Sequence, residues 1–216
     1  MDITWYGMSC FRITERSKTT VMTDPYGPHL GIQPTGTTKT DVVTVSHDAP
    51  GHNHVEGLKS EFYTLTTPGE YEIGGTFFTG VPLHAMVEEQ PFYNVGYLVN
   101  YDGLTVFHVG DLAQVPEQSL VQDLGEVNVL LLPVGSGNTL SASEASEVVS
   151  LIEPNYIVPM HYAVPGMTLD LDPVDKFLKA MGVTTVEEED TLKVSSSSLP
   201  EQPEVVLLRP QIEPLA

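Results

Sequence analysis

The feature that most constrains the fold of this sequence is a change in the pattern of apolar residues at Gly110-Asp111. Before this point, short runs of β-branched and aromatic residues follow one another between turn residues, which is typical of closely spaced strands. After it, apolar runs alternate with segments of helical spacing. We therefore predict two strand-rich halves, the second interleaved with helices, that form two sheets sandwiched between layers of helices.

The strands predicted in the first half are short. Val42–Ser46 is nearly apolar, as expected for a strand covered on both faces. Val95–Asn100 and Leu104–His108 bracket Tyr101-Asp102-Gly103, whose Asp-Gly step favours a hairpin. The other predicted strands are Ile3–Tyr6, Cys10–Ile13, Thr19–Thr23, Glu61–Leu65, Tyr71–Ile73 and Thr76–Val81.

The second half carries helix signals. Pro116–Leu124 has a proline in its first turn, and Ser141 with Glu144 forms a capping-box pattern ahead of Ala145–Ile152. A third helix is predicted from Asp172-Pro173 to about Met181, ending at Gly182. Without an internal repeat, residues 1–216 are expected to form a single domain. The strands predicted here are Val127–Leu132, Asn155–Met160 and Val205–Leu208.

The composition excludes several classes of protein. The 9 Lys and Arg residues face 29 Asp and Glu residues, and the net charge of −20 disfavours binding to nucleic acid or to an anionic membrane. The chain lacks an apolar run near the roughly 20 residues that span a bilayer, and it opens without a basic, then apolar, leader. We therefore expect a cytoplasmic protein.

Any metal site in this chain must use histidine and carboxylate ligands, because Cys10 is its single cysteine. His47 directly follows a predicted strand, and His161 ends another. Because ligand sites of sheet proteins lie at the carboxyl ends of strands, these positions matter more than the number of histidines. By contrast, His29 is expected to be solvated and His108 to be structural. The other candidates near strand ends are His52, His54, His84 and Asp111.

Several neutral imidazoles and a carboxylate that converge on one point suit Zn²⁺, Mn²⁺ or Fe. A metal bound in this way acidifies water and polarises a carbonyl or phosphoryl oxygen. The predicted set of imidazole and carboxylate ligands therefore indicates hydrolysis of a small molecule.

The order of these motifs along the chain resembles the metallo-β-lactamase superfamily, in the branch described as Zn-dependent hydrolases of the β-lactamase fold. The resemblance covers nearly the whole chain and implies a four-layer αββα sandwich. It also implies a metal site with the ligands His47, His52, His84, Asp111 and His161, with Asp111 central to catalysis and Asp24 orienting a ligand histidine. The segments that carry it are Ile3–Phe11, Thr23–Tyr26, Asp41–Asp48, Thr67–Glu72, His108–Leu112, Leu132–Gly135 and Pro159–Tyr162.

The chain departs from the family pattern at four polar positions. Where the family has His-x-His-x-Asp-His, the sequence from His47 to His52 carries Ala49 and Gly51, whose side chains cannot bind metal. The Gly-His-Ser of the branch has become Gly7-Met8-Ser9, and Gln114 stands where relatives often have histidine. The expected two-metal arrangement is therefore incomplete.

Three interpretations of the site remain open. His52, His161 and Asp111 hold one ion, with Asp48 or His54 moving in to help; or His47, His84 and Asp111 hold it; or the site binds no metal. The first two predict a mononuclear hydrolase that acts on a small ester, amide, lactone or phosphoester. The third predicts an inactive relative that binds a ligand or serves a structural role. The resemblance also allows homo-oligomers.

Overall fold

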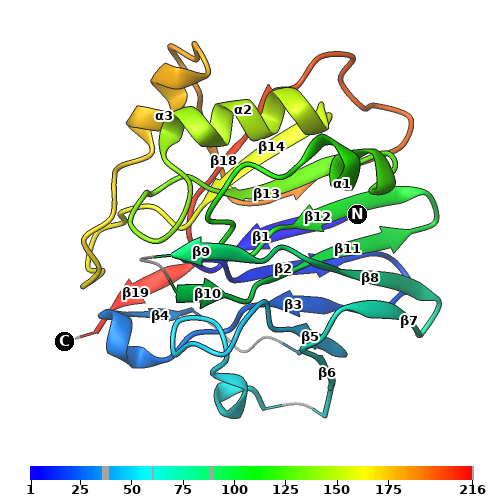
Figure 1. Cartoon of the computed structure of the whole chain (residues 1–216). Helices are drawn as coiled ribbons and strands as arrows, with labels where there is room; N and C mark the ends of the chain where they lie inside the picture. Colours follow the sequence, from blue (N-terminus) through cyan, green and yellow to red (C-terminus); the bar gives the residue numbers. More distant parts are fainter. Residues whose placement is uncertain (36–38, 60, 88–89, 216) are drawn as a thin grey trace.

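The computed structural model describes residues 1–35, 39–59, 61–87 and 90–215, and its main feature is a pair of β-sheets packed face to face (Figure 1). The first sheet has six strands in the order β16-β1-β2-β3-β5-β6. Strands β3, β5 and β6 are parallel to one another, and the remaining neighbours are antiparallel. Their bounds are β1 (Asp2–Trp5), β2 (Phe11–Thr14), β3 (Val21–Thr23), β5 (Val42–Thr44), β6 (Tyr63–Leu65) and β16 (Leu192–Lys193).

The second sheet has seven strands in the order β17-β14-β13-β12-β11-β8-β7. Strands β12, β13, β14 and β17 run parallel, whereas β7, β8, β11 and β12 pair antiparallel as successive neighbours. The predicted hairpin at Asp102-Gly103 joins β11 to β12. The bounds are β7 (Gly69–Ile73), β8 (Thr76–Pro82), β11 (Val95–Tyr101), β12 (Leu104–His108), β13 (Val129–Pro133), β14 (Tyr156–Met160) and β17 (Glu204–Val205).

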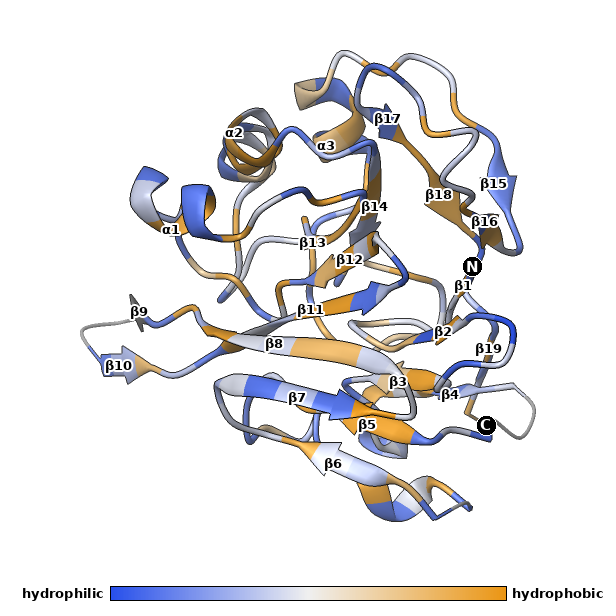
Figure 2. Cartoon of the chain, turned by 90° about the vertical axis from the view of Figure 1, so that its right-hand side faces the viewer, coloured by the Kyte–Doolittle hydropathy of each residue, from blue (hydrophilic) through white to orange (hydrophobic). Residues whose placement is uncertain are grey.

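The main core lies between the two sheets and extends to the helices over the seven-stranded sheet, which contribute Val148 and Phe177. Trp5 and Phe11 of the first sheet and Tyr97 and Phe107 of the second belong to one buried apolar cluster. Because burial of an aromatic or aliphatic side chain stabilises the fold by about 1.5–3 kcal/mol, these contacts hold the sheets together. Figure 2 shows apolar colour along the inner strands and polar colour on peripheral ones such as β15 (Glu188–Glu189).

Helices complete the outer layers. The helices α1 (Gln118–Asp123), α2 (Ala142–Ile152) and α3 (Asp175–Ala180) lie over the seven-stranded sheet (Figure 1). Below the six-stranded sheet, the helices among the described residues of the outer layer are two single-turn 3-10 helices, η1 (Pro28–Leu30) and η2 (Val55–Gly57). The αββα sandwich implied by the resemblance is therefore confirmed, with one thin outer layer. Within the described residues, no helix is long and apolar enough to cross a membrane.

The structure differs from the predicted elements mainly near the C-terminus. The strand predicted at Val205–Leu208 is two strands, because Val205 pairs with β14 whereas β18 (Leu207–Leu208) pairs with β15. Helix α1 begins later than predicted because Glu117 is extended. Two ribbons that the sequence did not indicate are β9 (Ala85–Val87) with β10 (Gln90–Phe92), and β4 (Ile32–Pro34) with β19 (Ile212–Pro214).

The predicted capping box of α2 is present, and it generates a test of local stability. The Ser141 hydroxyl accepts a hydrogen bond from the backbone N–H of Glu144, whose carboxylate accepts one from the Ser141 N–H. We expect Ser141→Ala to lower the free energy of unfolding by about 1 kcal/mol, because a donor at the helix start loses its partner. Urea denaturation followed by circular dichroism measures the change. Ser143→Ala, an exposed serine one position inside α2, is the matched control, and an equal loss there would contradict the capping role.

Candidate metal centre

The candidate residues meet at one edge of the sandwich, where the carboxyl ends of parallel strands from both sheets lie together. Asp24 follows β3, and His47 and His52 lie in the segment after β5. From the other sheet, Asp111 follows β12 and His161 follows β14. Residues far apart in sequence are thus brought together because β3 and β5 run parallel in one sheet and β12 and β14 in the other.

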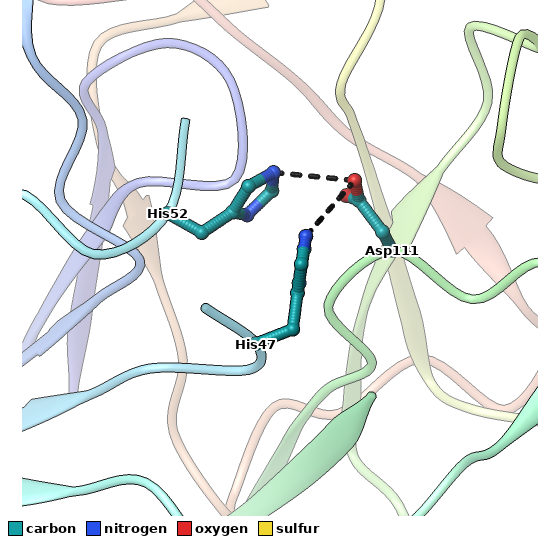
Figure 3. Close-up of side chains that lie close together, drawn as sticks. All are labelled: His47, His52 and Asp111. Atoms are coloured by element: carbon teal, nitrogen blue, oxygen red, sulfur yellow. Dashed lines mark ion pairs between the residues drawn. The ribbon is translucent and has the colours of Figure 1, made fainter. Parts of the chain in front are cut away.

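Three imidazoles surround one carboxylate oxygen. The Oδ2 atom of Asp111 lies 3.2 Å from His52 Nε2, 3.4 Å from His161 Nε2 and 3.8 Å from His47 Nε2. Figure 3 shows His47 and His52 pointing at Asp111 from the opposite sheet. Ligand atoms of His47, His52 and Asp111 all lie within 4.8 Å of one another. Together with His161, these residues form a group of four, His47, His52, Asp111 and His161, which we call the metal cluster.

A second carboxylate, Asp24, fixes the orientation of two of these imidazoles. Asp24 is fully buried and accepts hydrogen bonds from His52 Nδ1 at 2.9 Å, from the Ser46 N–H at 2.8 Å and from the Ser46 hydroxyl at 2.6 Å. Because the Ser46 hydroxyl gives its proton to Asp24, it accepts from His47 Nδ1, 3.0 Å away. Both histidines therefore direct Nε2 at the metal cluster.

The charges of the metal cluster are strongly coupled. Burial alone would lower the pKa of His52, but Asp111 and Asp24 on its two sides outweigh that effect and raise the pKa to about 10. Burial would raise the pKa of both carboxyls, yet the neighbouring imidazoles hold the pKa of Asp111 and of Asp24 below their usual values. The pKa values of His47 and His161 are lowered by burial. Near neutral pH, one imidazolium thus lies between two carboxylates.

The distances of His52 Nε2 and His161 Nε2 from Asp111 Oδ2 are compatible with ligands of one metal ion. His161 does not belong to the group of His47, His52 and Asp111 whose ligand atoms all lie within 4.8 Å of one another. With ligand bonds of about 2.0–2.2 Å, the ligand atoms of a tetrahedral zinc site are about 3.3–3.6 Å apart, which is close to the separations of His52 and His161 from Asp111. The other oxygen of Asp111, Oδ1, is buried and has no hydrogen-bond partner among the described residues. A buried charged oxygen without a partner is costly, and a cation would satisfy it. Imidazole nitrogens with one carboxylate are a donor set that zinc accepts.

The backbone around the metal cluster is shaped by two glycines. Gly110, which precedes Asp111, has a φ of +58°, and a Cβ at this position would collide with Asn94 and Ser46. Asn94 in turn accepts a hydrogen bond from the Asp111 N–H at 3.3 Å. At Gly135, a Cβ would collide with the carbonyl oxygen of His161. Only glycine therefore allows both loops to come this close.

The positions that depart from the family pattern lie beside the metal cluster. A Cβ built on Gly51 would have the methyl Cε of Met8 as its nearest neighbour, at 3.8 Å. Met8 is buried, and its carbonyl accepts hydrogen bonds from the His161 N–H at 3.1 Å and from Trp5 Nε1 at 2.9 Å. An apolar methyl group therefore faces the space that a longer side chain at Gly51 would enter.

Three predicted candidates lie outside the metal cluster. His84 is exposed, and its ring packs edge-on against Tyr93 with the ring centroids 4.9 Å apart. His54 pairs with the exposed Glu56 at 3.7 Å, and Asp48 is exposed and accepts a hydrogen bond from Asn53. The structure thus does not bring His84, His54 or Asp48 to Asp111, because the side chains of His84 and Asp48 are exposed and that of His54 packs beside Gly27 and Gly57.

Two residues that the sequence did not single out contact the metal cluster. Ser46 orients His47, as described above, and Phe92 of β10 packs edge-on against the His47 ring at a centroid distance of 5.1 Å. The sequence indicates Ser46 only weakly, because it directly precedes His47. The sequence does not indicate Phe92, because its contact with His47 depends on the β9–β10 ribbon. As predicted, His108 is structural: it is fully buried, with Nε2 bonded to the Ser9 carbonyl at 2.9 Å.

Comparison with known proteins shows the family of the chain. The family model described as "Beta-lactamase superfamily domain" matches residues 2–161. A UPF0173 protein from Pyrococcus furiosus is 31% identical over 201 residues, covering 84% of this chain and 90% of the relative. A UPF0173 metal-dependent hydrolase from Methanoculleus marisnigri is 28% identical over 233 residues, covering 95% and 97%.

Solved structures show the same fold. A protein described as a Zn-dependent hydrolase of the metallo-beta-lactamase superfamily, from Thermotoga maritima, superposes with a TM-score of 0.77 at 32% identity and covers 96% of this chain and 97% of its own. The metallo hydrolase Igni18 from Ignicoccus hospitalis superposes with a TM-score of 0.66 at 20% identity, covering 90% and 99%. The second likeness concerns the fold alone.

The raised pKa of His52 generates a test on metal-free protein. The folded pKa of about 10 exceeds the usual value of about 6.5, so the proton on His52 stabilises the folded state fully below pH 6.5. This stabilisation is lost as the pH rises from about 6.5 to about 10. In chelator, we expect the difference in unfolding free energy between wild type and His52→Gln to fall by roughly half or more over this range. A difference that stays constant would show that His52 is not charged between the two carboxylates.

Proposed function

Because this chain belongs to the beta-lactamase superfamily, we propose that it is a hydrolase that works with one divalent metal ion, most naturally zinc. Its relatives include a protein described as a UPF0173 metal-dependent hydrolase. The observation that carries the proposal is the approach of His52 Nε2 and His161 Nε2 to the same oxygen of Asp111, at 3.2 and 3.4 Å. These three residues are the proposed ligands.

One ion, rather than two, follows from the side chains present. A second ion would need its own ligands, and Ala49 and Gly51 offer none. His84 is turned away from Asp111 and packs against Tyr93. Three protein ligands leave one position of a tetrahedral zinc site open, which is the arrangement of catalytic rather than structural zinc.

The bound metal would supply Lewis acidity, which lowers the pKa of water and polarises a carbonyl or phosphoryl oxygen. His47 Nε2 lies 3.8 Å from Asp111 Oδ2, farther than the nitrogens of the other two imidazoles. Its Nδ1 donates to Ser46, so Nε2 carries a lone pair, and burial keeps the imidazole neutral by lowering its pKa. His47 Nε2 therefore accepts a proton from the attacking water. Asp24 holds His52 in place, and Phe92 shields one edge of His47 from solvent.

The proposed substrate is a small molecule with an ester, amide, lactone or phosphoester bond. The net charge of −20 makes a polyanionic nucleic acid an unfavourable partner. The cytoplasmic location and the homo-oligomers considered above stay predictions.

Metal content of site variants tests the ligand assignment. Wild-type protein purified without chelator or His-tag should carry about one equivalent of zinc, manganese or iron. His161→Ala and Asp111→Asn should lose it, because each removes one of three ligands. His84→Ala is the matched control and should keep the metal. Elemental analysis measures all four proteins; two equivalents in wild type, or full retention in His161→Ala, would contradict the assignment.

A further variant separates a ligand from a proton acceptor at His47. His47→Gln should keep about one metal ion yet lose hydrolysis of chromogenic esters and phosphodiesters by a factor of about 100 or more, as expected for loss of a general base. Loss of metal from His47→Gln would instead make His47 a ligand. Wild type without metal even after reconstitution would favour the inactive, ligand-binding alternative, in which Met8 and Gly51 mark an abandoned site.

Metal binding should also release protons, because His52 must lose the proton that it holds between Asp24 and Asp111. At pH 7.5 we expect at least about one proton per zinc ion, against about 0.1 for a histidine of ordinary pKa. Calorimetric titrations of metal-free protein in buffers of different ionisation enthalpy give this number. A release far below one proton would contradict the charge state assigned to His52.

A further inference from the structure

A cavity of 350 Å³ lies on the outer face of the six-stranded sheet, separate from the metal cluster. The alternation of β3 defines the face, because Val21 belongs to the core between the sheets whereas Met22 belongs to a second apolar cluster. Met22, Tyr26 and Leu58 line the cavity, together with the thiol-bearing Cys10. The 3-10 helices η1 and η2 contribute Pro28 and Gly57 to its lining. Its volume falls in the range of roughly 300–1,000 Å³ typical of small-molecule sites.

The walls of the cavity are held in place by specific contacts. The hydroxyl of Tyr26 donates to the Tyr6 carbonyl at 2.6 Å. The ring of His54 lies between two lining glycines: a Cβ on Gly57 would lie 2.9 Å from His54 Cδ2, and one on Gly27 would lie 3.4 Å from His54 Cγ. The cavity is therefore formed before any ligand arrives, which lowers the entropic cost of binding.

The charge of the cavity differs from that of the protein. The chain has 29 acidic residues, yet among the described residues that line the cavity none is Asp or Glu. Lys59, one of only 9 Lys and Arg residues, lines it together with His54 and Gln33. Lys59 and Glu56 are both exposed, but Glu56, which approaches His54 to 3.7 Å, does not belong to the lining. The acidic surface of the protein as a whole attracts cations, whereas the cavity offers an anion a favourable partner in Lys59.

We propose that this cavity binds a small apolar monocarboxylate, such as a medium-chain fatty acid. The carboxylate pairs with Lys59, and the apolar body lies against Met22, Tyr26 and Leu58. The site is independent of the proposed hydrolysis, although two of its lining residues follow groups of the candidate metal centre: Pro25 follows Asp24, and His54 lies two residues after His52. The His54 N–H donates to the Pro25 carbonyl at 2.8 Å and joins these two segments.

The test is calorimetric titration of the full chain with octanoate, 1-octanol and octylamine, which share one apolar body and differ in charge. It is done in chelator, and repeated with His161→Ala, so that binding of the carboxylate to a metal ion is removed. Octanoate should bind with a stoichiometry of one, and at least about tenfold more tightly than octylamine, as expected for one charge-assisted contact. No octanoate binding, or a preference for octylamine, would overturn the proposal.

Substitutions of charged residues at and near the cavity test whether octanoate binds there. Lys59→Gln should weaken octanoate binding about tenfold and leave 1-octanol unchanged, because it removes only the charge–carboxylate contact. Lys193→Gln, an exposed lysine on β16, is the matched control and should change neither. Glu56→Gln should tighten octanoate binding, because it removes a nearby negative charge. Equal effects of Lys59→Gln and Lys193→Gln would show that octanoate binds elsewhere.

Discussion

Two buried carboxylates, Asp24 after β3 and Asp111 after β12, approach the same imidazole from opposite sides at the edge where the two sheets meet. His52 lies 2.9 Å from the first carboxylate and 3.2 Å from the second. Two buried anions without a cation between them would be strongly destabilising. The protein therefore needs either a proton on His52 or a metal ion beside Asp111. This choice couples folding, metal binding and pH.

The same arrangement supports the proposal of one metal ion rather than two. Asp111 is the only carboxylate of the metal cluster, and its Oδ2 atom faces three imidazoles. Beside Gly51, the space is bounded by the methyl group of Met8. Ala49 and Gly51 have no side chain that can bind metal, and the methyl group of Met8 makes the space beside Gly51 apolar. In the proposed function, His47, kept in place by Ser46, accepts a proton instead of holding a second ion.

Much of the fold was predictable from the sequence because periodicity and turn chemistry are local. The Asp-Gly hairpin, the capping box at Ser141 and the strands before Asp24, His47 and His161 all follow from short patterns. The choice among the histidines was not predictable, because it depends on which way each loop side chain turns. His84 follows β8 much as His161 follows β14, yet it faces Tyr93 rather than Asp111. The cavity beneath the six-stranded sheet was also hidden, since Met22, Tyr26 and Leu58 meet only through the tertiary fold.

X-ray absorption spectroscopy at the zinc edge, on protein given two equivalents of zinc and then freed of excess metal, distinguishes one bound zinc ion from two. For the proposed site we expect zinc in a histidine-rich shell of N and O ligands at about 2.0–2.1 Å, without a second zinc nearby. A zinc–zinc separation of about 3.5–4 Å would show a two-metal centre and contradict it. A shell without imidazole scattering would equally contradict the roles given to His52 and His161.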